Sequence, residues 1–193
     1  MPLIDRVALL MTLRQLESWA ESELQVVLVG GSAVVALVRD AEATRDVDML
    51  WTDEMRALVE RLGPAKWEAL AAKLALSLRA DPFEVHLPDD WRTRAVRHED
   101  LSVGELSVFT PSLEDLAVMK LLRFNAKDAQ DIRRLAEVPF NRDLFRTLFL
   151  RVLPYAIGDL WWHAQSFEML WNRLYPDSLV EADELMRAAG LTP

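Results

Sequence analysis

Two short segments of this 193-residue chain have the residue types needed to bind a phosphorylated ligand. The first is a glycine pair followed by a serine, Gly30-Gly31-Ser32, at the end of an apolar run. Glycine lets a phosphate approach the backbone N–H groups closely, because no Cβ intervenes. The second holds Asp46 and Asp48, which lie on one face if the segment is a strand. Together the segments predict a site for a nucleoside triphosphate and its Mg²⁺.

Each segment also has a simpler explanation. Taken alone, the glycine pair is better explained as a tight turn between a strand and a helix, because Gly-Gly is a general turn signal. Asp46 and Asp48 are surface residues in the simpler interpretation, although aspartate is depleted in strands and two on one face repel each other without a cation. The metal site is therefore the preferred interpretation when both segments are taken together.

A strand, a helix and a second strand are expected to position these segments. Residues 25–29 form a β-branched run typical of a buried strand, and residues 33–38 predict the helix after the glycine turn. Residues 46–51 predict the second strand. Before them, apolar residues at helical spacing predict an amphipathic helix over residues 3–23, with Leu3, Val7, Leu10, Leu13, Leu16 and Trp19 on its buried stripe.

Two further strands follow the first pair. Residues 83–87 alternate between apolar and polar side chains, which predicts a half-buried strand with Glu84 and His86 on its polar face. In the simpler interpretation that face only contacts solvent. Residues 106–109 predict a short strand.

Helices dominate the rest of the chain. Ser112 is a predicted N-cap, and the helix after it is almost entirely apolar around Lys120. A lysine in such surroundings needs a partner or a ligand, unless it is a solvated helix charge. Another helix begins near Lys127 and includes Asp128 and Asp131.

The strand signals stop near Pro139, which predicts a division of the chain. We expect an α/β core over residues 1–138, built from a small mixed sheet flanked by helices, and a helical extension over residues 139–193. Tryptophans in the extension favour core packing, or an interaction surface if they are exposed.

Composition narrows the function classes. The net charge of −9 argues against broad electrostatic capture of nucleic acid, although Arg92, Arg94 and Arg97 form a local basic cluster beside Trp91. The chain has no cysteine, so it has neither disulfides nor a cysteine-based zinc site. No segment is typical of a signal peptide or of a membrane-spanning helix, so a cytoplasmic protein without membrane partners is expected.

The order of these motifs resembles a known superfamily. Gly-Gly-Ser, a helix and then Thr-x-Asp-x-Asp are similar to the signature of the DNA polymerase β-like nucleotidyltransferases. Residues 111–122, followed by Lys127, Asp128 and Asp131, resemble the AbiEii and MenT-type branch, which contains toxins of type IV toxin–antitoxin systems. The resemblance covers roughly residues 25–135.

The resemblance implies a role for each matching residue. Gly30, Gly31 and Ser32 would hold the β- and γ-phosphates, and Asp46 and Asp48 would bind Mg²⁺ or Mn²⁺. The nucleotide-binding residues implied on the later helices are Lys120, Lys127 and Asp128, while Asp128 and Asp131 could instead orient basic side chains.

The implied reaction moves a nucleoside monophosphate from an NTP to a hydroxyl of a tRNA or a protein, and a cognate antitoxin is an implied partner. Two positions depart from the pattern: Glu42 replaces a basic residue, and the strand expected to supply the third metal carboxylate, residues 83–87, offers Glu84 or His86 instead of an aspartate. The alternative is therefore a catalytically degenerate module that binds nucleotide or a partner. An antitoxin or regulator is a third interpretation.

Overall fold

The computed structural model describes residues 3–77 and 86–192. The chain divides into two compact units, one made of Met1–Glu84 and Trp91–Ser112 and the other of Val85–Asp90 and Leu113–Pro193. The predicted extension over residues 139–193 lies inside the second unit, and its boundary near Pro139 stays a prediction.

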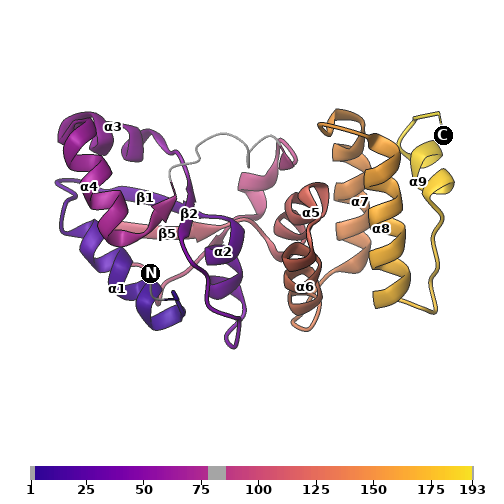
Figure 1. The fold of residues 1–193 in the computed structure, drawn as a ribbon, viewed down its shortest axis with the longest axis horizontal. Helices are drawn as coiled ribbons and strands as arrows, with labels where there is room; N and C mark the ends of the chain where they lie inside the picture. The colour runs from indigo at the N-terminus through magenta and orange to yellow at the C-terminus, as the bar shows by residue number, and fades with distance from the viewer. Residues whose placement is uncertain (1–2, 78–85, 193) are drawn as a thin grey trace. The chain divides into compact units, whose positions relative to one another are not determined.

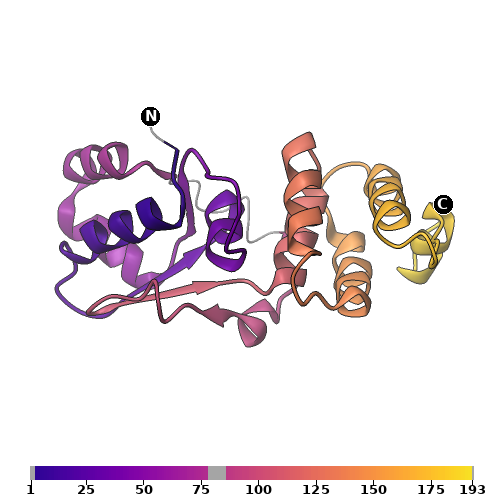
Figure 2. The same cartoon turned by 90° about the horizontal axis from the view of Figure 1, so that it is seen from below.

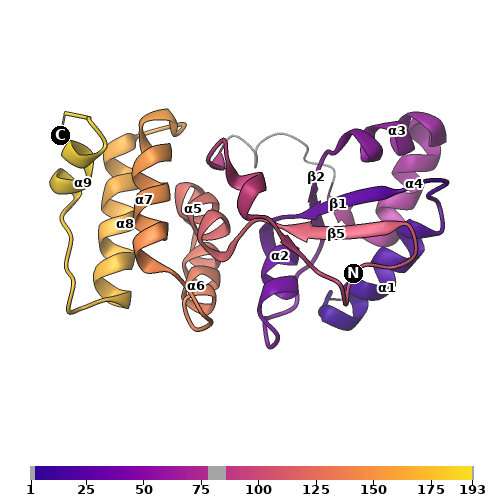
Figure 3. The ribbon, with the colours of Figure 1, turned by 180° about the vertical axis from the view of Figure 1, so that it is seen from behind.

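A mixed sheet of five strands forms the centre of the first unit, in the order β3-β2-β1-β5-β4. β1 pairs in parallel with β5 and antiparallel with β2, while β2 pairs in parallel with β3, and β4 pairs antiparallel with β5. Figure 3 shows β5 directly beside β1. The strands are β1 (Leu24–Leu28), β2 (Val47–Leu50), β3 (Leu76–Ser77), β4 (Val96–Arg97) and β5 (Leu106–Thr110). The mixed α/β fold expected from the sequence is therefore confirmed.

Four helices accompany this sheet in the described part of the first unit. They are α1 (Arg6–Glu17), α2 (Gly30–Leu37), α3 (Asp53–Leu62) and α4 (Pro64–Leu74). Figure 2 shows α1 and α2, in indigo and purple, on the same side of the salmon strand β5. The buried stripe of α1 is Leu9, Leu13 and Leu16, and the side chains of Leu3, Val7 and Trp19 are exposed, so the predicted stripe was wrong at these three positions.

The two faces of the sheet differ in burial. Leu24, Val26 and Leu28 of β1 are buried, whereas Gln25 is exposed and Val27 is half-buried. β5 repeats this alternation, because its odd-numbered residues are half-buried. The register places Val27 opposite both Leu50 and Phe109, so these three side chains share the less covered face.

Helices make up most of the second unit. They are α5 (Leu113–Arg123), α6 (Ala126–Leu135), α7 (Arg142–Val152), α8 (Leu160–Leu174) and α9 (Ala182–Ala188). α7 and α8 lie side by side in Figure 1. Their aromatic rings stack between them, with 4.4 Å between the centroids of Phe149 and Phe167 and 5.3 Å between those of Phe167 and Trp171. The tryptophan of this stack therefore serves the core, as the simpler interpretation predicted.

Several predicted boundaries shift by a few residues. Gly30-Gly31-Ser32 forms the first turn of α2 itself, and β2 begins at Val47, so Asp46 lies immediately before the strand. The strand predicted over residues 83–87 lies mostly outside the described residues, and its described part, His86 and Leu87, is not in a strand.

A buried histidine directly after β4 leads to a pH prediction. The Nε2 atom of His98 lies 2.9 Å from Oγ1 of Thr110. Burial, helped by the charge of Arg6 and opposed by Asp100, lowers the pKa of His98. Its folded pKa is then below the unfolded value of about 6.5, so the stability it contributes is present above that pH and is lost as pH falls through the folded pKa.

We therefore expect the His98→Gln variant to lose less stability than the native chain when pH falls from about 8 to about 5.5. Urea unfolding at the two pH values measures this difference. Equal losses in the variant and the native chain would show that His98 does not contribute to the pH dependence.

Candidate functional site

Gly30 lies directly against the carboxylate of Asp48. Its φ of +58° is in the left-handed region, which favours glycine. A Cβ at this position would overlap Oδ2 of Asp48 and lie 2.9 Å from its Cγ. The glycine is therefore needed twice, once for the backbone conformation and once for the space that the carboxylate occupies.

The N-terminus of α2 supplies backbone donors at the same place. The first N–H groups of a helix have no acceptor within the helix, and Val29, the N-cap residue, provides no side-chain cap. The positive end of the helix dipole adds to these donors, so such a terminus suits an anion. Gly31 in this first turn is half-buried. The residues expected to contact phosphates are thus placed on a helix N-terminus beside Asp48.

Ser32 has a clear structural contribution. Its buried hydroxyl oxygen lies 2.8 Å from the carbonyl oxygen of Val29 and 2.9 Å from that of Asp48, and the two carbonyl oxygens share its one hydrogen. The Val29 N–H also donates to the Asp48 carbonyl oxygen, at 3.0 Å. These bonds fix the start of α2 against β2. A contact of Ser32 with phosphate stays a prediction.

Asp46 and Asp48 suit one hard divalent cation. Asp46 is exposed just before β2, and Asp48 is half-buried within it. Carboxylate oxygens are the ligands Mg²⁺ prefers, and it commonly uses one or two of them together with substrate phosphates. Among the described residues, no group of three or more histidine, aspartate or glutamate side chains gathers as a metal site. The donor set therefore fits a cation shared with a bound triphosphate.

Glu84 and His86 are the two residues that could supply a third metal ligand. Glu84 lies outside the described residues, and His86 belongs to the second unit. Burial, followed by the charges of His163 and Arg123, lowers the pKa of His86. The neutral imidazole is therefore favoured at His86, whose role in metal binding stays a prediction.

Lys120 is part of a buried ionic cluster in the second unit. Its Nζ donates to Oδ2 of Asp131 at 2.7 Å and lies 3.7 Å from Oδ1 of Asp128. Arg123 donates through two nitrogens to the carboxylate of Asp128, at 2.6 and 3.0 Å. Asp128 also forms a capping box with Asn125 at the start of α6. The two aspartates therefore orient basic side chains, one of the roles that the resemblance implied.

Lys127 is in a different environment from Lys120. It lies in the first turn of α6 and is exposed, whereas the Lys120 side chain is only 1% exposed. An exposed ammonium can meet an incoming phosphate without leaving a buried partner. Contacts of Lys120 or Lys127 with nucleotide stay predictions.

Comparison with known proteins gives one match. A family described as a nucleotidyltransferase of unknown function (DUF6036) matches residues 7–140. The chain belongs to this family. The match supports the nucleotidyltransferase superfamily, but it does not extend to the AbiEii and MenT-type branch. Neither the curated proteins nor the solved structures give a match.

The residues that match the family include all five strands of the sheet, and they include Asp46 and Asp48. It also reaches through α5 and α6, which hold the buried ionic cluster. Among the residues that the structure describes, no helix combines the length and apolar composition needed to cross a membrane.

Sequence reasoning missed a hollow on the less covered face of this sheet. The hollow has a volume of ≈ 480 Å³ and is lined by residues of β1, β5, the end of β2 with the start of α3, and the segment 91–95 before β4. Its aromatic side chains are Trp51, Trp91 and Phe109. The basic cluster after Trp91 was a signal for it, but the strand register that brings Phe109 beside Val27 and Leu50 was not readable from the sequence.

Proposed function

We propose that this chain is a Mg²⁺-dependent nucleotidyltransferase that transfers a nucleoside monophosphate from an NTP to a hydroxyl of an RNA or a protein. The backbone N–H groups at the N-terminus of α2 bind the β- and γ-phosphates, and Asp46 and Asp48 hold the cation. The bound cation would neutralise negative charge on the triphosphate. We further propose that the chain acts in the manner of the AbiEii and MenT-type toxins, with a cognate antitoxin as partner.

The transfer itself requires little covalent chemistry from the protein. The acceptor hydroxyl oxygen attacks the α-phosphorus and forms a new O–P bond. The bond from the α-phosphorus to its bridging oxygen breaks, and pyrophosphate leaves with the electron pair. A carboxylate of the site receives the hydroxyl proton and passes it to solvent, which is the role we assign to Asp46 because it is exposed.

The observation that carries the proposal is the position of Gly30 against Asp48. A glycine without a Cβ, a helix N-terminus whose N-cap residue provides no side-chain cap, and a carboxylate meet at one point of the fold. Phosphate donors and a cation ligand must be adjacent in nucleotidyl transfer, because the cation and the protein contact the same triphosphate. The family match supports the same activity.

A second candidate is a nucleotide-binding module that lacks transfer activity. The observation in its favour is that the described residues provide no group of three acidic or histidine side chains for metal. Two-metal transfer usually needs more ligands than Asp46 and Asp48 provide. This candidate binds an NTP in the same place and releases it unchanged.

Incubation with α-³²P-labelled NTPs, with total RNA and total cell protein offered separately, distinguishes the two candidates. We expect label to enter one pool with Mg²⁺, and not with EDTA or with the Asp46→Ala/Asp48→Ala variant. Equilibrium binding of each NTP is measured in parallel. Mg²⁺-dependent NTP binding without transfer to either pool would contradict the transferase and support the binding module.

A further inference from the structure

The aromatic hollow on the sheet shares its face with the proposed cation site. Asp48 and Leu50 are two residues apart in β2, so their side chains point to the same face, with Cα atoms about 7 Å apart. Leu50 lines the hollow, and it lies opposite Val27, which also lines it. The hollow therefore begins one side-chain step from the carboxylate of Asp48.

The order along the strands indicates which substrate the hollow faces. β1 and β2 are antiparallel, and Gly30 follows β1 at the end where β2 begins. The hollow lies toward the opposite end of β2, where Leu50, Trp51 and Thr52 line it. Asp48 is thus between the glycine turn and the hollow. Because attacking and leaving oxygens are roughly in line, an acceptor must approach from the side opposite the pyrophosphate.

The walls of the hollow suit a side-chain-sized organic group. Trp51 and Phe109 are half-buried, and their rings offer apolar surface to a ligand. The guanidinium carbon of Arg92 lies 4.8 Å from the centroid of the Trp91 ring, so a cation already stacks on one aromatic wall. The volume of ≈ 480 Å³ is within the usual range of small-ligand sites.

The charged residues at the rim of the hollow favour a ligand of positive charge. Asp53 and Glu54, in the first turn of α3, line this hollow, with Arg92 as its basic residue. The two carboxylates also line a neighbouring hollow of ≈ 430 Å³, together with Glu21 and Glu23. They offset the positive end of the α3 dipole, so this helix start does not attract phosphate.

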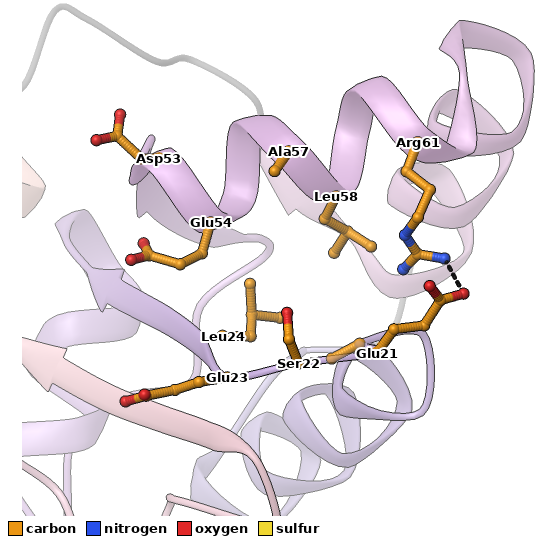
Figure 4. Close-up of a pocket in the computed structure, with 10 residues that line it drawn as sticks. Glu21, Ser22, Glu23, Leu24, Asp53, Glu54, Ala57, Leu58 and Arg61 are labelled. Carbon is orange, nitrogen blue, oxygen red and sulfur yellow. Dashed lines mark hydrogen bonds and ion pairs between the residues drawn. The ribbon is translucent and has the colours of Figure 1, made fainter.

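Figure 4 shows that further acidic side chains line the neighbouring hollow. Arg61 reaches from α3 to Glu21, with 2.7 Å between Nη1 and Oε1, at one end of the view. The carboxylates of Glu23 and Glu54 lie toward the other end. Since Asp53 and Glu54 line both hollows, an extended ligand that fills one meets the acidic surface of the other.

We propose that the aromatic hollow binds the acceptor, and that this acceptor is a basic polypeptide segment bearing a hydroxyl side chain. This inference rests on the proposed transferase function and chooses between its two acceptor classes. A polyanionic RNA would meet Asp53 and Glu54, whereas lysine or arginine beside a serine or tyrosine would pair with them. The hydroxyl oxygen bonds to the α-phosphorus, pyrophosphate leaves with the electron pair of the broken bond, and the proton passes through a carboxylate to solvent.

The first test removes the two negative charges at the rim and keeps the size of the two side chains. The Asp53→Asn/Glu54→Gln variant is compared with Asp183→Asn/Glu184→Gln, which makes the same change in the first turn of α9. The probe is a fluorescein-labelled peptide with a serine and a tyrosine between arginines, and binding is read by anisotropy without NTP. We expect the first variant to bind the peptide about tenfold more weakly and with a smaller salt dependence, and the control to bind like the native chain.

A second variant tests the aromatic wall and the identity of the occupant. Phe109→Ala is expected to weaken peptide binding about tenfold and to leave the Kd for Mg²⁺-NTP unchanged. Weaker NTP binding with unchanged peptide binding would place the donor's base in the hollow and overturn the inference. Unchanged peptide binding in both Phe109→Ala and Asp53→Asn/Glu54→Gln would also overturn it.

Transfer assays separate this inference from the proposed function. Label from NTP should enter the basic peptide, and a matched peptide with glutamates in place of arginines should remain unlabelled. Transfer to a short single-stranded RNA, with no transfer to the peptide, would overturn the inference and leave the transferase function standing. Peptide binding at the hollow without transfer to any acceptor would contradict the transferase function instead.

Discussion

Replacing Gly30 with alanine is expected to abolish detectable transfer and to destabilise the fold by at least about 2 kcal/mol. The first part of the cost is conformational, since alanine at a φ of +58° is strained by about 1 kcal/mol. The second part is steric, because the new Cβ would overlap Oδ2 of Asp48. Asp48 or the start of α2 must then move, and either movement separates the cation ligand from the phosphate donors.

Gly63 provides a matched control for this variant. Its φ of +73° and ψ of +160° lie in a region that essentially only glycine populates, but nothing lies within 4 Å of a Cβ built there. Gly63→Ala should therefore show a conformational cost alone, about 1–3 kcal/mol, with transfer and NTP affinity retained. Urea unfolding measures the stability of each variant, and equilibrium binding measures the affinity for Mg²⁺-NTP.

The affinity for Mg²⁺-NTP is the property that distinguishes the two glycine variants. If Gly30→Ala keeps the same NTP affinity as Gly63→Ala, the contact between Gly30 and Asp48 has no part in nucleotide binding. If Gly30→Ala alone loses affinity, further replacement of Asp48 by alanine removes the overlap with the new Cβ. That double variant should regain stability but not activity, because it still lacks a cation ligand.

The sequence predicted the parts of the fold that local patterns specify. The β-branched run before Gly30 gave β1, and residues 106–109 gave most of β5. The helix predicted to begin near Lys127 is α6, which begins at Ala126. Exposure was harder to predict, since the stripe through Val7 on α1 has the same period as the stripe through Leu9 that is buried. Periodicity gives the presence of a face, and tertiary packing decides which face is covered.

Residue types predicted which ligands the candidate site could bind, but not which residues of the site are in contact. Glycine beside aspartate suggested phosphate and cation, but the contact of Gly30 with Asp48 depends on the antiparallel register of β1 and β2. The hollow depends on three strands and could not be read from any one segment. The partner of Lys120 was equally hidden, because Asp131 lies on the next helix and its distance follows from how α5 and α6 pack.

Replacing Lys120 with methionine is expected to lower the free energy of unfolding by about 3–5 kcal/mol. The Lys120 side chain is 1% exposed, and its partners Asp131 and Asp128 have side chains that are 7% and 0% exposed. Methionine has a similar length, so little packing is lost. The main cost is the carboxylate of Asp131, which would remain buried without its nearest cation. Asp128 would still bind Arg123 and the Asn125 N–H.

Two further variants test this explanation. Lys127→Met makes the same chemical change at an exposed position of α6 and should alter stability by less than about 0.5 kcal/mol. Lys120→Met/Asp131→Asn removes the charge that Lys120→Met leaves uncompensated, and it should recover part of the lost stability. Urea unfolding followed by tryptophan fluorescence measures the stability of all three variants.

If Lys120→Met unfolds at the same urea concentration as the native chain and binds Mg²⁺-NTP about tenfold more weakly, Lys120 is a nucleotide ligand. The expected pattern instead makes Lys120 the cation that holds α5 to α6.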